Sequence, residues 1–157
     1  NSDTIIYASA GKFTREDDIL IVYIGTNGSF STPDELILQI QAYIDYYKTT
    51  KVIVIGLHYR SGKLNNSSIY DLPMQKKFGS KFFNNRNYLS KYGISDAIRL
   101  GLLPDNGTYP TAQDTIDMNN GYPPTSIMSP DLIHFNNIGY DLMGHKLYEI
   151  GKNLGYW

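Results

Sequence analysis

"ILIVYIGTNGSFSTPDELILQIQAYIDYYKTTKVIVIGLHY", residues 19–59, contains two apolar runs on either side of a helical pattern. Residues 19–24 are apolar without alternation and rich in β-branched and aromatic types. That composition is typical of a strand covered on both faces, as in a parallel sheet. Residues 51–59 have the same character and predict a second buried strand.

The segment between the two runs predicts a helix. Ser31 or Thr32 can cap its N-terminus, and Pro33 suits the first turn. Apolar residues then recur at helical spacing: Leu36, Ile37, Ile40 and Ile44. A strand, a helix and a second strand in this order predict a right-handed βαβ crossover.

The sequence signals for secondary structure are weaker in the rest of the chain. Residues 60–80 are polar and predict an irregular excursion, and residues 81–83 and 85–92 predict a short strand and a helix. Residues 104–130 are rich in proline and glycine and predict a long irregular stretch, which in a compact domain often carries function. A last helix is predicted from about residue 136 to 153.

The composition of the chain limits what it can be. Its 157 residues suffice for a single compact domain, residues 1–157, and the net charge of −1 gives no reason to expect nucleic acid or an anionic membrane as partner. The absence of cysteine excludes disulfides, thiol catalysis and cysteine-based zinc sites. We find no close histidine pair and no glycine-rich phosphate loop, so neither a metal nor another cofactor is predicted. The fourteen tyrosines fit carbohydrate or protein contact surfaces, or a compositional habit of the source.

Polar residues and glycines follow both predicted strands. In open α/β sheets, ligands bind at the carboxyl ends of the strands. There Gly25 would let the backbone turn close to a ligand, and the Asn27 amide could donate to a developing oxyanion, although Asn-Gly after a strand also fits a simple turn. His58 and Tyr59 follow the second strand and either contact substrate or pack against the sheet.

Asp131 and His134 lie three positions apart, just before the last predicted helix. A carboxylate at this spacing can turn back to the imidazole, fix its tautomer and stabilise the imidazolium that forms in general-base catalysis. The alternative is that Asp131 caps a turn and His134 packs against the sheet.

Together these pieces resemble the SGNH (GDSL-type) hydrolase superfamily. Gly25–Thr26–Asn27 is similar to the third sequence block of that family, and Asp131–Leu132–Ile133–His134 with the following "FNNIGYDLMGHKL" is similar to the fifth. The stretches "NYLSKYGISDAIRLGLL" and "QDTIDMNNGYPPTSIMSPDLIHFNNIGY" resemble SGNH modules of bacterial or phage surface and tail proteins. The resemblance implies a three-layer α/β/α sandwich around a parallel sheet, flavodoxin-like in type.

The resemblance also implies roles for single residues. His134 would be the general base, Asp131 its orienting partner, and Asn27 with Gly25 part of the oxyanion hole. The reaction would be hydrolysis of acyl esters through an acyl-enzyme, for example of O-acetyl groups on a glycan. The location implied is extracellular, on a cell surface or on a virion.

The family's Gly-Asp-Ser block, which carries the nucleophile, has no counterpart in the sequence. The first predicted strand also has only later strands as neighbours, which would leave one long apolar edge. We therefore expect this chain to be the C-terminal portion of a larger domain, completed by an N-terminal segment or a companion chain that brings the serine. Ser29, the serine nearest to Asn27, is better explained as a turn residue. The alternative function is a non-catalytic glycan-binding or structural module of a phage-tail or cell-surface protein.

Overall fold

A parallel sheet organises the protein in a computed structural model that describes residues 18–25, 28, 30–58 and 68–157. The strands lie in the order β1 (Leu20–Val22), β2 (Val52–Ile55) and β3 (Phe82–Phe83). Both strand pairs are parallel, with Leu20 opposite Val52 and Val54 opposite Phe82. The strand–helix–strand unit and the parallel sheet predicted from the sequence are thereby confirmed, and the protein is a mixed α/β structure.

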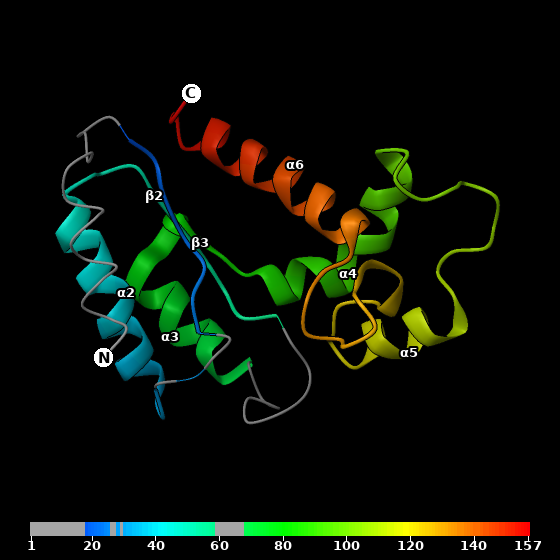
Figure 1. Cartoon of the computed structure of the whole chain (residues 1–157), viewed down its shortest axis with the longest axis horizontal. Helices are drawn as coiled ribbons and strands as arrows, with labels where there is room; N and C mark the ends of the chain where they lie inside the picture. The colour runs from blue at the N-terminus through cyan, green and yellow to red at the C-terminus, as the bar shows by residue number, and fades with distance from the viewer. Residues whose placement is uncertain (1–17, 26–27, 29, 59–67) are drawn as a thin grey trace.

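Five α-helices are present among the described residues. They are α2 (Pro33–Tyr47), α3 (Ser68–Phe78), α4 (Asn85–Arg99), α5 (Ala112–Asn119) and α6 (Asn137–Asn153). Two short 3₁₀ turns, η2 (Gly79–Lys81) and η3 (Thr125–Ile127), join them. In Figure 1, α2 and α3 lie beside the strands at one end of the molecule, and α4, α5 and the start of α6 gather at the other.

Helix α2 begins as its sequence predicts. Of the two candidate caps, Thr32 is the one used: its hydroxyl accepts a hydrogen bond from the backbone N–H of Glu35 at 3.2 Å. Pro33 occupies the first turn, and the helix ends at Lys48, which adopts a left-handed conformation with φ 56°.

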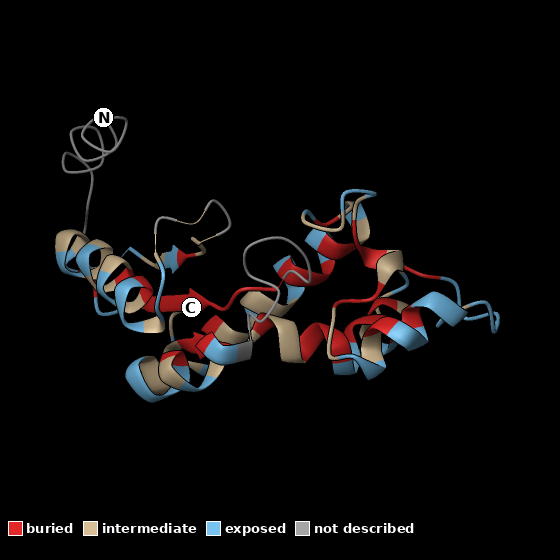
Figure 2. Ribbon diagram, turned by 90° about the horizontal axis from the view of Figure 1, so that it is seen from below, coloured by how far each residue is buried: buried red, intermediate tan, exposed pale blue. Residues whose placement is uncertain are grey.

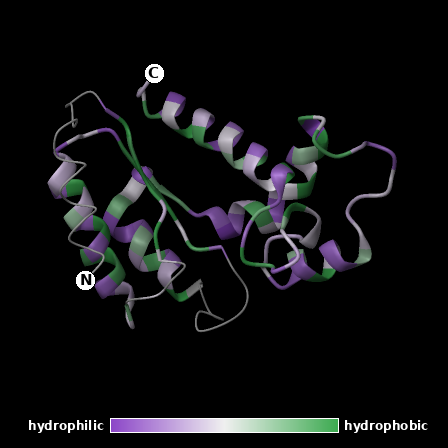
Figure 3. Ribbon diagram, viewed as in Figure 1, coloured by the Kyte–Doolittle hydropathy of each residue, from purple (hydrophilic) through white to green (hydrophobic). Residues whose placement is uncertain are grey.

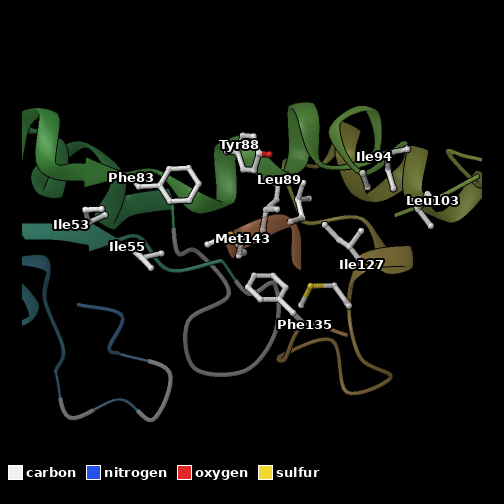
Figure 4. Packing of buried hydrophobic residues seen from close by; sticks show 13 residues of the cluster. Ile53, Ile55, Phe83, Tyr88, Leu89, Ile94, Leu103, Ile127, Phe135 and Met143 are labelled. Atoms are coloured by element: carbon white, nitrogen blue, oxygen red, sulfur yellow. The ribbon is translucent and has the colours of Figure 1, made fainter. Parts of the chain in front are cut away.

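Alternate residues of β2 enter two different hydrophobic clusters. Ile53 and Ile55 pack with residues of α4, α6 and the loop before α6, whereas Val52 and Val54 pack with residues of α2 and α3. Figure 4 shows the first cluster running from Ile53 past Phe135 towards Ile94. Strand β2 is buried along its whole length, and α2, α4 and α6 turn most of their apolar residues inwards (Figures 2 and 3). Burial on both faces explains the lack of alternation in its sequence.

Two expectations for the middle of the chain were incomplete. The polar excursion predicted at residues 60–80 contains helix α3, in which Tyr70 and Met74 are buried one helical turn apart. Helix α4, predicted to end near residue 92, continues to Arg99.

The predicted irregular stretch at residues 104–130 contains helix α5, held by buried carboxylates. The Asp114 carboxylate accepts hydrogen bonds from the backbone N–H groups of Thr111 and Ser126, each at 2.9 Å, and from their hydroxyls at 2.8 and 2.7 Å. The Asp114 N–H donates in return to the Thr111 hydroxyl at 3.1 Å. Asp117 likewise accepts from the N–H and hydroxyl of Thr125. Burial acts to raise the pKa of Asp114, but the hydrogen bonds from Ser126 and Thr111 hold it below its ordinary value. These carboxylates fold the stretch back onto α5.

Helix α6 begins and ends within about one residue of its predicted bounds. Gly139, Leu142 and Met143 are buried, whereas Tyr140 is 55% exposed. Gly139 allows the start of α6 to pack closely against Ile127, because a Cβ there would lie 2.3 Å from the carbonyl oxygen of that residue. The lack of a side chain therefore lets η3 and the loop at residues 128–136 pack directly against the start of α6.

Candidate functional site

Asp131 and His134 form a hydrogen-bonded pair in the loop before α6. Asp131 Oδ2 lies 2.7 Å from His134 Nδ1. The other carboxylate oxygen, Oδ1, accepts from the backbone N–H groups of Ile133 at 2.9 Å and His134 at 3.0 Å. The hydrogen bond from the His134 side chain, followed by the two backbone bonds, lowers the pKa of Asp131 to about 2. One carboxylate thus shapes the turn and orients the imidazole.

The loop that carries this pair is closed on itself. Met128 and Phe135 form an antiparallel bridge, and Ser129 donates its N–H to the His134 carbonyl at 2.8 Å and its hydroxyl to the Phe135 carbonyl at 2.9 Å. Leu132 takes a left-handed conformation, with φ 56°, at the tip. The pair is therefore displayed on a tight turn whose ends are held together by backbone bonds.

The pair faces solvent. The His134 side chain is 62% exposed and the Asp131 side chain 47%. His134 Nδ1 is engaged by the carboxylate, and no described residue hydrogen-bonds to Nε2. An imidazole held at Nδ1 with Nε2 open is the arrangement that a general base requires.

A buried polar cluster lies at the carboxyl ends of the three strands. Tyr23 follows β1, His58 follows β2 and Asn85 follows β3. The Tyr23 hydroxyl is hydrogen-bonded to His58 Nδ1, and Asn85 Nδ2 donates to the same hydroxyl at 3.3 Å. His58 Nε2 lies 2.8 Å from the carbonyl oxygen of Ile133, in the loop of the Asp131–His134 pair. The cluster therefore connects the strand ends to that loop.

His58 is a buried residue. It is 4% exposed, its ring stacks on Phe135 with centroids 4.3 Å apart, and both ring nitrogens are hydrogen-bonded. His58 is thus packed within the fold, and its predicted contact with substrate stays a prediction. Tyr23 and Asn85 were not singled out from the sequence, although their positions directly after strands were the available signal.

Gly25 lies between β1 and α2 and has φ 117°, a conformation that favours glycine. A Cβ there would lie 2.8 Å from Leu57 Cδ2, so a side chain at this position would require the buried Leu57 side chain to shift. Its part in an oxyanion hole stays a prediction. Asn27, the other predicted oxyanion residue, and Tyr59, the predicted substrate contact, lie outside the described residues.

Within the described part of the chain, no group of three or more His, Cys, Asp or Glu side chains is placed to hold a metal ion. His145, the remaining histidine, is exposed on α6. None of the described helices combines the length and apolar character needed to cross a membrane.

Comparisons of the chain with models of protein families, with curated proteins and with solved structures find no match. The resemblance to SGNH hydrolases therefore depends on the sequence motifs alone.

Acidification is expected to destabilise the fold through His58. Burial, the largest effect, lowers the pKa of His58 from 6.5 to about 4; the nearby His134 also lowers it, and the hydrogen bond to Ile133 partly opposes the shift. Between those two values the unfolded chain binds a proton that the folded chain excludes. Stability is therefore lost as the pH falls from 6.5 to about 4, by on the order of 3 kcal/mol in total.

Urea unfolding of the wild type and of His58→Gln at neutral pH and near pH 4 measures this contribution. Glutamine does not titrate, so the variant should lose less stability on acidification than the wild type. Equal losses of stability in the two proteins would contradict the attribution of this pH dependence to His58.

Proposed function

We propose that this protein takes part in SGNH-type ester hydrolysis, with His134 as general base and Asp131 as its orienting partner. The observation that carries the proposal is the 2.7 Å contact between Asp131 Oδ2 and His134 Nδ1, on a turn that leaves Nε2 open to solvent. A carboxylate that accepts from Nδ1–H keeps Nε2 unprotonated and able to take a proton.

The reaction proceeds in two proton-transfer cycles. A serine hydroxyl attacks the ester carbonyl as His134 Nε2 takes its proton, and the same nitrogen returns the proton to the leaving alcohol. Water then attacks the acyl-enzyme and loses its proton to Nε2, which passes the proton to the leaving serine oxygen as the carboxylic acid is released. Asp131 stabilises the imidazolium in both cycles, and the Asn27 amide with the Gly25 turn is proposed to stabilise the oxyanion.

The strand arrangement supports this proposal. Ligands of open parallel sheets bind at the carboxyl ends of strands, and the Asp131–His134 loop is attached there through His58. The burial of β2 against helices on both faces is compatible with a three-layer α/β/α sandwich of the SGNH type.

We propose that the nucleophilic serine comes from outside these 157 residues. No described serine hydroxyl is bonded to His134 Nε2, and Ser129, the nearest in sequence, donates its hydroxyl to the Phe135 carbonyl. An N-terminal segment of the same domain or a companion chain would supply it. The proposed substrate is an acyl ester, with O-acetyl groups on a surface glycan as the specific case.

Labelling of the native preparation with a fluorophosphonate probe tests the proposal. Intact masses measured under denaturing conditions show which chain gains the label. A labelled companion chain, or a label upstream of Asn1, would support a serine esterase with an external nucleophile. A label within these 157 residues would show that a local serine such as Ser29 is the nucleophile. No label, beside a labelled control esterase, would contradict the enzymatic proposal.

The second candidate is a non-catalytic glycan-binding module. The observation that favours it is an open hollow of about 330 Å³ along α6, lined by Leu102, Tyr140, Asp141, Gly144, His145 and Tyr148. Tyr140 and Tyr148 are 55% and 57% exposed, and exposed aromatic rings beside polar groups suit the faces and hydroxyls of sugars. Saturable sugar binding without any probe labelling would favour this candidate.

A further inference from the structure

We propose that His58 is a positioning residue for the Asp131–His134 pair, because its imidazole holds the carbonyl of Ile133 in place. The catalytic meaning of this inference depends on the proposed esterase function, but the structural coupling between His58 and the loop can be tested without it.

The hydrogen bond from His58 attaches the loop to the sheet. Its Nε2 lies 2.8 Å from the carbonyl oxygen of Ile133, a residue 75 positions away in the sequence. Among the described residues, this is the only hydrogen bond that joins residues 130–134 to a part of the chain outside the loop at residues 128–136. All the other hydrogen bonds of these five residues stay within that loop.

The same hydrogen bond acts directly beside the proposed base. The N–H of Ile133 donates to Asp131 Oδ1, and its carbonyl accepts from His58. The next residue is His134, whose own N–H donates to the same carboxylate oxygen. A shift of the Ile133 carbonyl would therefore move both the carboxylate contacts and the backbone that carries the imidazole.

Chemistry fixes the directions of the three hydrogen bonds that join Asn85, Tyr23, His58 and Ile133. A carbonyl oxygen only accepts, so His58 Nε2 carries the proton and, in the neutral ring, Nδ1 accepts from the Tyr23 hydroxyl. The Tyr23 oxygen in turn accepts from Asn85 Nδ2 at 3.3 Å. The lowered pKa of His58 agrees with a neutral ring at pH 7. Tyr23 thus selects the His58 tautomer that can donate to the loop.

Packing alone does not explain this cluster. An apolar ring would fill the space against Phe135. The polar cluster instead leaves Asn85 Oδ1, in a fully buried side chain, without a hydrogen-bond partner among the described residues. A buried unpaired acceptor costs stability. What the cluster provides is orientation, because a chain of donors with fixed directions runs from the strand ends to Ile133.

Amide hydrogen exchange in the full chain, measured by NMR, tests the inference with two matched variants. His58→Phe keeps a flat ring against Phe135 and removes the donor, whereas His58→Gln offers an amide N–H near the position of Nε2. In His58→Phe we expect the amides of Ile133 and His134 to exchange about 10–100-fold faster, as for the loss of one buried hydrogen bond. In His58→Gln the rates should return to within about threefold of wild type.

Amides of α2, such as that of Ile40, report on the whole fold. Faster exchange confined to the loop supports the inference. Unchanged exchange at Ile133 and His134, or an equal increase in α2, overturns it. Should His58→Phe fail to fold, Tyr23→Phe decides the question, because it keeps the histidine and removes only the hydroxyl that selects its tautomer. Tyr23→Phe should accelerate hydrogen exchange at the amides of Ile133 and His134 by a smaller factor than His58→Phe does. Unchanged exchange rates would overturn the inference.

Ester hydrolysis by the native preparation separates this inference from the proposed function. With the enzyme active, His58→Phe should lower kcat by about tenfold at nearly constant KM, and His58→Gln should restore most of it, since the histidine orients the base without touching substrate. An inactive wild type would refute the proposed function, and the exchange rates would still decide whether His58 positions the loop.

Discussion

Replacement of the proposed base, His134→Ala, is expected to lower kcat for ester hydrolysis by on the order of 10⁴–10⁶. His134 Nε2 is the atom proposed to take the serine proton and return it to the leaving alcohol. Without it, neither half of the reaction has a positioned base. Binding of the substrate should change much less, because the imidazole acts in the proton-transfer steps. Initial rates of aryl acetate hydrolysis by the native preparation measure the loss.

His145→Ala is the matched control for this variant. His145 is also an exposed histidine, but it lies on α6 and has no assigned role in the reaction. The control should keep the wild-type rate. The thermal midpoint of His134→Ala should stay near that of wild type, since the side chain is 62% exposed and, within the described part of the chain, hydrogen-bonds only to Asp131. A rate within about tenfold of wild type would show that His134 is not the base.

Local signals explain which parts of the structure could be predicted from the sequence. The β1–α2–β2 unit follows from two apolar runs and from Thr32 with Pro33 at the helix start, all of which act over a few residues. The Asp131–His134 contact was predictable for the same reason, because a three-residue separation closes a turn without help from the rest of the chain.

Helix α5 shows why other parts could not be predicted. Its buried residues are Asp114 and Asp117, whereas Ile116 is 54% exposed. The usual pattern of apolar residues inside and polar residues outside is therefore reversed, and hydrogen bonds such as those to Thr111, Thr125 and Ser126 explain the reversal.

The polar cluster behind the candidate site was hidden for a different reason. Tyr23 and His58 lie 35 positions apart, and Asn85 is 62 positions from Tyr23. Their contact requires that three strands pair in parallel with a particular register, which no local pattern specifies. The sequence thus indicated the exposed pair, but not the buried residues that attach it to the sheet.

The substitution Asp131→Asn is expected to lower kcat by about 10⁴ while leaving the turn intact, as the equivalent change does in a Ser-His-Asp triad. Two backbone N–H groups, those of Ile133 and His134, point at Oδ1 and will keep an oxygen there. The asparagine NH₂ group must then face His134 Nδ1, in place of the present Oδ2. A donor at that position forces the ring proton from Nδ1 to Nε2. The imidazole would keep its place but could no longer accept the serine proton.

Asp131→Ala separates the two roles of the carboxylate. Alanine removes both the turn-forming oxygen and the orienting one, so the amides of Ile133 and His134 should exchange faster, whereas in Asp131→Asn they should stay protected. The ¹⁵N shifts of the His134 ring should report the change of tautomer in Asp131→Asn directly. Wild-type activity in Asp131→Asn, with the same protected amides, would mean that Asp131 only caps the turn. The aspartate would then be a structural residue, and the proposed catalytic pair would lose its orienting half.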